Sequence, residues 1–542
     1  MKTRHEFSLL LLASTILACA GDDSSSTDSF GETLSTGDGD ADGDTEAGDG
    51  DGDPTAGDGD GDPTGDGDGD PTGDGDGDPT GDGDGDPPVD ACAFASNSTN
   101  WTLPQDLGGS DVYEQLTDYH SCNGGGEYRY QLLDMTGDGA VDFLVTDSCG
   151  LDGVGFTTWN VFKNTGSGFA GQPISWSLPE YLIGNGQFYE QITDYWSCEG
   201  GEFRYQLLDM TGDGAVDLLV TDTCDVGGVG NSNWLVHENT GNGFADQPIE
   251  WSLPQYLVGG NTEFYEQIAN YWPCNGGEFR YQLLDMTGDG AIDFLVTDAC
   301  DDVGVGASQW LVHENTGDGF DGQPIEWGLP QVFGEESEIY EQTADYWPCN
   351  GGEFRYQLLD MTGDGAIDFL ITDACDETGV GATEWHVLEN TGTGFAGAPI
   401  IWSLPNPLGG GEIYEQIADY WSCNQGVYRF QTLDMTGDRA PDLVVTDGCD
   451  LTGVGTDRWD VFKNTGDGFE AQPISWPLPT EVAGDDLHEN LTDYWSCNGG
   501  ETYRYSVLDL NGDGAPDFVA TDLCDAEGVG TTHWSLYAAV CE

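Results

Sequence analysis

The sequence predicts an all-β fold, a six-bladed β-propeller of four-stranded antiparallel blades, in about the last five-sixths of the chain. A unit of 74–76 residues recurs six times there, marked by Trp-X-Leu-Pro at Trp101, Trp176, Trp251, Trp327, Trp402 and Trp476. Each unit holds short, alternating apolar segments separated by Gly-containing turns, which are typical of antiparallel strands. The chain lacks the long 3.6-residue periodicity of a helical solenoid, so radial repetition of β-sheets is expected.

The second unit shows which segments form the blade. Residues 202–210 alternate and are rich in aromatic and aliphatic side chains, and residues 216–223 follow after a tight loop. Residues 234–239 predict a third strand and 244–253 a fourth, where Pro248 indicates a sheet edge.

The two ends of the repeat region predict a closed ring. The last unit lacks its fourth strand, and residues 91–101 precede the first unit with the same Phe-to-Trp spacing as a fourth strand. We therefore expect the 91–101 strand to complete the sixth blade and leave no open sheet edge. By alignment with the other units, Cys92 and Cys541 are neighbours, so a Cys92–Cys541 disulfide is predicted to close the ring.

Composition excludes several functions. The 542 residues include 101 Asp and Glu against 12 Lys and Arg, a formal net charge of −89. Nucleic acid and anionic lipid surfaces both require basic patches and are therefore excluded as partners. The 15 cysteines indicate disulfides and an oxidising compartment.

The N-terminus predicts an export signal. Residues 1–18 carry Lys2 and Arg4 followed by twelve apolar or small residues, too few to span a bilayer. The sequence Ile16-Leu17-Ala18-Cys19 resembles the lipobox of bacterial lipoproteins, which implies cleavage before Cys19 and lipidation of this residue. The alternative is an ordinary secretory signal.

A spacer is predicted between the signal and the propeller. Residues 19–90 consist largely of GDGDGDPT repeats with almost no apolar side chains, so nothing offsets the entropy of ordering them. We expect a disordered acidic tether over 19–90. The alternative is a calcium reservoir, because Asp at every second position offers many oxygens. These Asp residues lack loops of fixed geometry, so they should bind calcium only weakly.

Each unit carries one nine-residue loop between its first two predicted strands, with the pattern D-x-x-G-D-G-x-x-D and one departure. We call these the Asp loops and number their positions 1–9. Calcium prefers six to eight oxygens on a sharply turned loop, and positions 1, 3, 5, 7 and 9 can supply them. Position 12 is aliphatic or Ala, which excludes an EF-hand. The candidate ligands are Asp134, Thr136, Asp138, Ala140 and Asp142; Asp209, Thr211, Asp213, Ala215 and Asp217; Asp285, Thr287, Asp289, Ala291 and Asp293; Asp360, Thr362, Asp364, Ala366 and Asp368; Asp434, Thr436, Asp438 and Asp442; and Asp509, Asn511, Asp513, Ala515 and Asp517.

The segment LDLNGDGAPDFVATD of the sixth unit, with a later turn such as NTGDGF, resembles FG-GAP/VCBS repeats over residues 91–542. The resemblance implies a calcium-binding β-propeller like the integrin α-subunit head, with up to six structural Ca²⁺ ions. Two departures weaken it: Thr replaces Asn or Asp at position 3 in five loops, and Arg439 replaces Gly at position 6 of the 434–442 loop. The alternative is an Asp/Gly turn without metal.

Two cysteines recur in each unit, 26 or 27 residues apart, on either side of the Asp loop. A hairpin that folds at the loop brings them opposite each other, so six disulfides are predicted, with zinc thiolate sites as the weaker alternative. The predicted pairs are Cys122/Cys149, Cys198/Cys224, Cys274/Cys300, Cys349/Cys375, Cys423/Cys449 and Cys497/Cys524.

Recognition is expected at the loops on the face opposite the Asp loops, such as 225–233 and 255–274. Tyr195-Trp196 and their counterparts are candidate contacts, and packing between blades is their alternative role. One Arg recurs per unit and is expected to pair with a carboxylate, or else to form an anion-binding ring: Arg129, Arg204, Arg280, Arg355, Arg429 and Arg504.

We therefore expect a calcium-stabilised, non-catalytic binding or adhesion module of the FG-GAP/VCBS type. Its ligand would be an unknown protein or glycan, and the chain would be monomeric. We expect it in the bacterial cell envelope, facing outward and touching the membrane only through its lipid anchor, or secreted. A lectin-like propeller is the alternative. A polysaccharide-acting enzyme is less favoured, because near-identical units supply no asymmetric catalytic constellation.

Overall fold

The structure, a computed structural model, describes most of the repeat region. The described residues are 92–541 except 106–112, 123–126, 150–152, 181–188, 199–200, 225–226, 259–260, 263–264, 275–276, 301–303, 332–339, 350–351, 376–377, 408–413, 424–425, 450, 480–487, 498–501 and 525. The predicted signal peptide, Cys19 and the predicted tether lie outside them.

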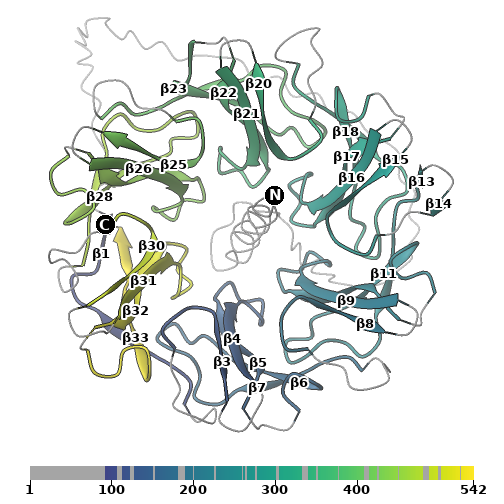
Figure 1. The fold of residues 1–542 in the computed structure, drawn as a ribbon, viewed down its shortest axis with the longest axis horizontal. Helices are drawn as coiled ribbons and strands as arrows, with labels where there is room; N and C mark the ends of the chain where they lie inside the picture. The colour runs from purple at the N-terminus through teal and green to yellow at the C-terminus, as the bar shows by residue number, and fades with distance from the viewer. Residues whose placement is uncertain are drawn as a thin grey trace, which may run out of the picture. The chain divides into compact units, whose positions relative to one another are not determined.

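Six antiparallel five-stranded sheets are arranged around a common axis in the described residues (Figure 1). The fold is all-β and a six-bladed β-propeller, as predicted. The first blade consists of β3 (Asp118–Ser121), β4 (Glu127–Leu133), β5 (Asp142–Asp147), β6 (Thr158–Phe162) and β7 (Ile174–Ser177). The second consists of β8 (Asp194–Cys198), β9 (Gly201–Leu208), β10 (Asp217–Asp222), β11 (Asn233–His237) and β12 (Ile249–Ser252). The third consists of β15 (Asn270–Cys274), β16 (Gly277–Leu284), β17 (Asp293–Ala299), β18 (Gln309–His313) and β19 (Ile325–Gly328).

The remaining blades repeat this order. The fourth consists of β20 (Ala344–Cys349), β21 (Gly352–Leu359), β22 (Asp368–Ala374), β23 (Thr378–Leu388) and β24 (Ile400–Ser403). The fifth consists of β25 (Ala418–Cys423), β26 (Gly426–Leu433), β27 (Asp442–Gly448), β28 (Arg458–Phe462) and β29 (Ile474–Pro477). The sixth consists of β30 (Thr492–Ser496), β31 (Thr502–Leu508), β32 (Asp517–Leu523), β33 (His533–Tyr537) and β2 (Thr99–Thr102). A small hairpin, β13 (Leu257–Val258) with β14 (Asn261–Thr262), lies between the second and third blades in sequence.

The prediction of four strands per blade was wrong by one strand. The DYWSC-type segment, expected as part of a loop, forms an additional edge strand that pairs with the first predicted strand, as β8 does with β9. Its aromatic side chains favour a strand, and its last residue, Cys198, pairs with Gly201, the first residue of β9. This strand brings the exposed Tyr195 beside Arg204.

The two ends of the repeat region meet at the sixth blade. The segment expected as one strand over 91–101 forms two: β1 (Cys92–Phe94) pairs with β34 (Ala539–Cys541), and β2 pairs with β33. Phe94 lies edge-on to Trp459 and Trp476 of the fifth blade and to Phe518 of the sixth. The N-terminal segment therefore joins both blades at their common boundary.

The apolar core lies between consecutive blades. Within the described part of the chain, six buried clusters each combine residues of two successive blades, and one of them joins the sixth blade to the first. Twelve Trp residues are fully buried there. They form cross-strand pairs such as Trp159 with Trp176 and Trp534 with Trp101, which explains two of the three Trp positions in the repeat. Among the described residues, there is no helix long and apolar enough to cross a membrane.

Candidate metal loops and binding face

Each Asp loop joins the second and third strands of its blade and is held by its own carboxylates. In the second blade, Asp209 accepts hydrogen bonds from the backbone N–H groups of Gly212 (2.8 Å) and Gly214 (2.9 Å). Asp217 accepts from the N–H groups of Met210 (3.1 Å) and Thr211 (3.0 Å). The Asp residues at positions 1 and 9 therefore fix the turn.

These carboxylates are largely buried. The position-9 Asp is fully buried in all six described loops, as Asp142 and Asp217 illustrate. Burial first, and the charges of neighbouring carboxylates to a smaller extent, raise the pKa of Asp217 to about 7 and that of Asp209 to about 6. Convergent buried carboxylates favour a bound cation, because it would offset the cost of their ionisation.

The loops offer further oxygens that suit Ca²⁺. The hydroxyls of Thr136, Thr287 and Thr436, at position 3, are buried and have no hydrogen-bond partner among the described residues. A hard cation takes such neutral oxygens together with carboxylates. As the side chains stand, no three His, Cys, Asp or Glu residues of the described ranges form a group that could hold a metal ion. In this arrangement the Asp oxygens face backbone N–H groups.

The six loops contact one another in a closed ring. A Cβ added to Gly137 at position 4 would come 2.8 Å from the Cβ of Ala215 at position 7 of the next loop, and its φ of +67° also requires Gly. The same contact recurs from loop to loop and returns from Gly512 to Ala140. Gly at position 4 therefore serves loop-to-loop packing as well as the turn.

An Asn that the motif analysis did not single out links neighbouring loops. Asn239 donates from its backbone N–H to Asp217 (2.9 Å) and from Nδ2 to the carbonyls of Met135 (2.9 Å) and Val216 (3.0 Å). Met135 belongs to the preceding blade. The sequence feature that could have identified this Asn is its recurrence before Thr-Gly in five units, at Asn164, Asn239, Asn315, Asn390 and Asn464.

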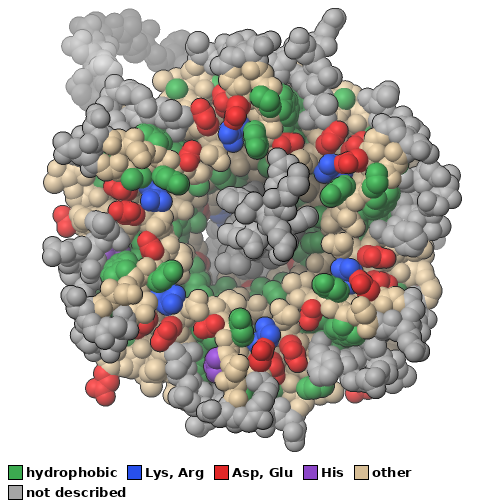
Figure 2. All heavy atoms as spheres, viewed as in Figure 1, with side chains coloured by type: hydrophobic (Ala, Val, Ile, Leu, Met, Phe, Trp, Pro, Cys, Tyr) green, Lys and Arg blue, Asp and Glu red, His purple; other side chains and the backbone are tan. Residues whose placement is uncertain are grey.

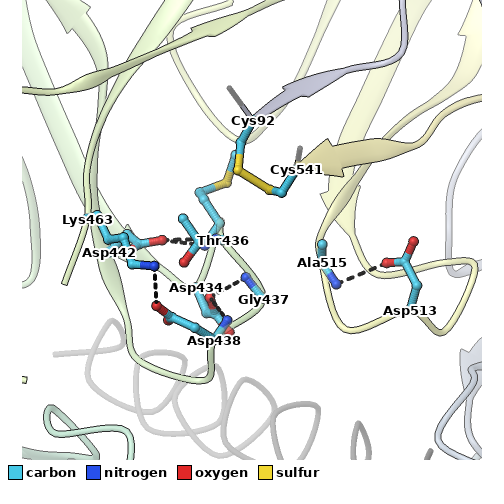
Figure 3. Close-up of a disulfide and its surroundings, with 11 residues drawn as sticks. Cys92, Asp434, Thr436, Gly437, Asp438, Asp442, Lys463, Asp513, Ala515 and Cys541 are labelled. Atoms are coloured by element: carbon cyan, nitrogen blue, oxygen red, sulfur yellow. Dashed lines mark hydrogen bonds and ion pairs between the residues drawn. A yellow bond between two sulfur atoms is a disulfide. The ribbon is translucent and has the colours of Figure 1, made fainter. Parts of the chain in front are cut away.

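The departures from the motif have structural counterparts. Arg439 adopts a φ of +73°, which is strained for a residue with a side chain, and its N–H still donates to Asp434 (2.7 Å). In two loops a Lys binds the position-5 Asp: Lys163 lies 2.7 Å from Asp138. Lys463 lies 3.1 Å from Asp438 in the fifth loop (Figure 3).

Disulfides brace the other end of these hairpins, and a further one, Cys92–Cys541, joins β1 to β34. The described bridges are Cys92–Cys541, Cys122–Cys149, Cys274–Cys300, Cys349–Cys375, Cys423–Cys449 and Cys497–Cys524, all of them predicted. Cys224 is also disulfide-bonded, while the side chain of its predicted partner Cys198 lies outside the described residues. Multiple disulfides indicate an extracellular or periplasmic location.

Next to the disulfides, each blade presents an Arg stacked on an exposed Tyr. We call these twelve residues the Tyr–Arg ring. The guanidinium carbon lies 4.7–5.0 Å from the Tyr ring centroid in all six blades, and the Tyr side chains are 48–65% exposed. Figure 2 shows Lys or Arg side chains with acidic and apolar neighbours recurring around one face. The pairs are Tyr119/Arg129, Tyr195/Arg204, Tyr271/Arg280, Tyr346/Arg355, Tyr420/Arg429 and Tyr494/Arg504.

Carboxylates surround each guanidinium. Arg204 binds Glu202 (2.5 Å) on its own strand, whereas Arg429 lies 3.7 Å from Glu489 of the next blade. Pairing with carboxylates was predicted, and both the same-strand and the cross-blade partners occur. Asp222 lies in the same neighbourhood, where burial first and then the charge of Glu266 raise its pKa to about 6. The surroundings of the Tyr–Arg ring are thus acidic overall.

In five blades the residue after this Tyr is a Trp, and in the first blade it is His120. The Trp has the structural role that was its alternative. Trp196 stacks on Phe203 with ring centroids 4.6 Å apart, while the adjacent Tyr195 points outward. The alternation of side chains along β8 separates the two. Only the Tyr of this pair therefore stays a candidate for recognition.

Comparison with known proteins gives similarity in fold only. No protein-family profile matches the chain, and no curated protein sequence matches it. The chain is similar to the Tc holotoxin pore of Photorhabdus luminescens, with 17% identity and a TM-score of 0.41 over 82% of this chain and 15% of the toxin chain. It is also similar to an α-L-arabinofuranosidase from Fusarium graminearum in complex with an iminosugar inhibitor, with 9% identity and a TM-score of 0.27 over 83% and 98% of the respective chains. The fold is established by the sheets and registers of this chain itself.

Proposed function

We propose that the protein is a calcium-stabilised binding or adhesion module whose recognition surface is the Tyr–Arg ring. The observation that carries the proposal is the sixfold repetition of an exposed Tyr stacked on Arg beside braced hairpin ends. Exposed aromatic rings held in place by their neighbours suit recognition at low entropic cost. Repetition around a ring lets one ligand engage several equivalent positions, which raises avidity.

Calcium is proposed to bind in the Asp loops as a structural ion. The support is chemical: paired buried carboxylates, unpartnered Thr hydroxyls and a tight Gly turn, as in the FG-GAP/VCBS repeats that the sequence resembles. Bound Ca²⁺ would neutralise part of the loop charge and link two strands of each blade. A catalytic role is not proposed, because six loops with nearly the same sequence provide no single asymmetric site.

The proposed setting is the bacterial cell envelope. The predicted lipobox at Cys19 would supply a lipid anchor, and the acidic 19–90 segment would hold the propeller away from the membrane. The protein is proposed to act there as a monomer, or to be secreted if Cys19 is not lipidated.

A lectin-like function is the second candidate. Exposed Tyr rings flanked by carboxylates, such as Tyr195 with Glu202 and Asp194, resemble in chemistry the aromatic and hydrogen-bonding surfaces that suit sugars. A glycan array and a pull-down with extracellular proteins, both run with the purified chain in calcium, separate the lectin from the protein-binding adhesin.

The Tyr–Arg ring is tested with the ligand that the glycan array or the pull-down identifies. Replacement of Tyr195, Tyr271 and Tyr346 together by Ala should weaken binding at least tenfold. The control is Ile401→Ser, which alters an exposed apolar side chain on β24 outside the Tyr–Arg ring. Unchanged affinity in the triple variant would place recognition elsewhere.

A further inference from the structure

In two of the six blades, a Lys side chain from outside the Asp loop forms an ion pair with an Asp of that loop. In the first blade, Lys163 Nζ lies 2.7 Å from Oδ2 of Asp138. In the fifth blade, Lys463 Nζ lies 3.1 Å from Oδ2 of Asp438 (Figure 3). Both Asp residues occupy position 5, where a carboxylate is needed to ligate calcium. The ammonium group therefore takes an oxygen that a calcium ion would need.

The other four blades have no basic residue at this place. The Lys position is the residue directly before the Asn of the NTG turn, and it is Glu238, Glu314 and Glu389 in the second to fourth blades and Ala538 in the sixth. Lys163 and Lys463 show that a side chain from this position can reach the loop, and in three other blades the residue at this position is an acidic Glu. The loops thus differ sharply in charge although their motifs are nearly identical.

We propose that Lys163 and Lys463 act as built-in counter-ions, so that the 134–142 and 434–442 loops bind Ca²⁺ far more weakly than the other four. The inference rests on the proposed calcium function of the loops. Its physical basis is Coulombic. A positive charge within a few ångströms repels a divalent cation, whereas the Glu that three other units have at this position would attract it. The first and fifth blades would then hold their shape with little calcium.

Arg439 adds a second effect in the fifth blade. It places a further positive residue inside the loop and keeps a left-handed backbone without Gly. The fifth loop should therefore be the weakest, followed by the first. The second, third and fourth loops, with an additional Glu each, should be the strongest, and the sixth should lie between these groups.

The test is a calcium titration of the purified chain by isothermal calorimetry, with bound metal counted after dialysis. We expect four tight sites and two that are at least about tenfold weaker. Six equivalent sites would overturn the inference while supporting calcium in the loops. Absence of any calcium binding would overturn both the inference and the proposed calcium function.

Charge-reversal variants test the Lys residues directly. Lys163→Glu should convert the first loop into a tight site and raise the tight stoichiometry from four to five. Glu314→Lys should lower it from four to three. The matched control, Glu326→Lys, makes the same charge change on an exposed position of β19 in the same blade and should leave the stoichiometry at four. If Lys163→Glu and Glu314→Lys both leave the number of tight sites at four, the Lys residues do not act as counter-ions. Circular dichroism of each variant checks that it is folded.

Discussion

His488 is the one place where the sixth unit breaks a pattern of buried aromatic residues among the described blades. The other five blades have Tyr113, Tyr189, Tyr265, Tyr340 and Tyr414 there, all fully buried. His488 is equally buried, it packs against Trp495, Tyr503, Tyr505 and Phe518, and neither ring nitrogen has a hydrogen-bond partner in the described structure. Burial lowers the pKa of His488 to about 4, with Asp493 opposing the shift.

The His488→Tyr variant should therefore be less sensitive to acid than the wild type. Because the unfolded chain protonates this His near pH 6.5 and the folded chain only near pH 4, stability is lost as the pH falls through this window, by roughly 3 kcal/mol in total. Thermal unfolding of both proteins at pH 7 and pH 5 measures the difference, which should widen at pH 5. A difference that is independent of pH would contradict this account.

At the scale of the element, the central hairpin of each blade has an Asp loop at one end and a disulfide at the other. In the third blade these are the 285–293 loop and Cys274–Cys300, joined by β16 and β17. The disulfide fixes the end that carries the Tyr–Arg ring. The loop end is instead held by carboxylate and amide hydrogen bonds, and it is there that a metal ion would add most stability.

Calcium should consequently raise the melting temperature, and chelation with EGTA should lower it. A site that binds only the folded state adds about 2.7 kcal/mol when calcium is present at 100 times its dissociation constant. Differential scanning calorimetry with Ca²⁺, Mg²⁺ or EGTA provides the measurement. Asp217→Asn should also reduce bound calcium by one ion.

The matched control for Asp217→Asn is Asp246→Asn, the same change at an exposed turn of the same blade. It should leave the number of bound ions unchanged. Identical melting temperatures with calcium and with EGTA would show that the loops need no metal for stability.

At the scale of the whole propeller, the ring closes where the two ends of the repeat region meet. Every described boundary between blades has an apolar cluster, but the boundary of the fifth and sixth blades depends on residues from the N-terminal strand, including Phe94. The sixth unit has Ala539 where the other units have the loop-linking Asn, so it has no side-chain amide to bridge the loops. The Cys92–Cys541 disulfide joins the N-terminal strand β1 covalently to β34 (Figure 3).

Removal of that disulfide should destabilise the propeller more than removal of a hairpin disulfide. The residues of Cys92–Cys541 are 449 apart and those of Cys349–Cys375 are 26 apart, so loop entropy predicts a difference of roughly 2.5 kcal/mol. Denaturant unfolding of Cys92→Ser/Cys541→Ser and of Cys349→Ser/Cys375→Ser makes the comparison. Equal losses would show that the ring is closed mainly by packing.

Much of the fold could be predicted because each unit repeats the same local signals. The period set the number of blades, and the cysteine spacing around the Asp loop set the hairpin bridges. The fifth strand was missed because a five-residue segment such as 194–198, with its mixture of Asp, Tyr, Trp and Cys, has too short an alternation to be told from a loop. Lys163 was missed for another reason: its partner Asp138 is 25 positions away and meets it only across the folded blade.

The sequence by itself determined the repeat number, the strand order within a unit, the Asp loops and the cysteine pairs, because these depend on spacing along one hairpin. Only the tertiary structure decided which Tyr is exposed and which Trp is buried, since a one-residue alternation on an edge strand separates Tyr195 from Trp196. It also decided that Arg stacks on Tyr and that Lys occupies two of the loops. Those pairings depend on contacts between strands and between blades, and side-chain distances of this kind are set by the closed ring rather than by neighbouring residues in the chain.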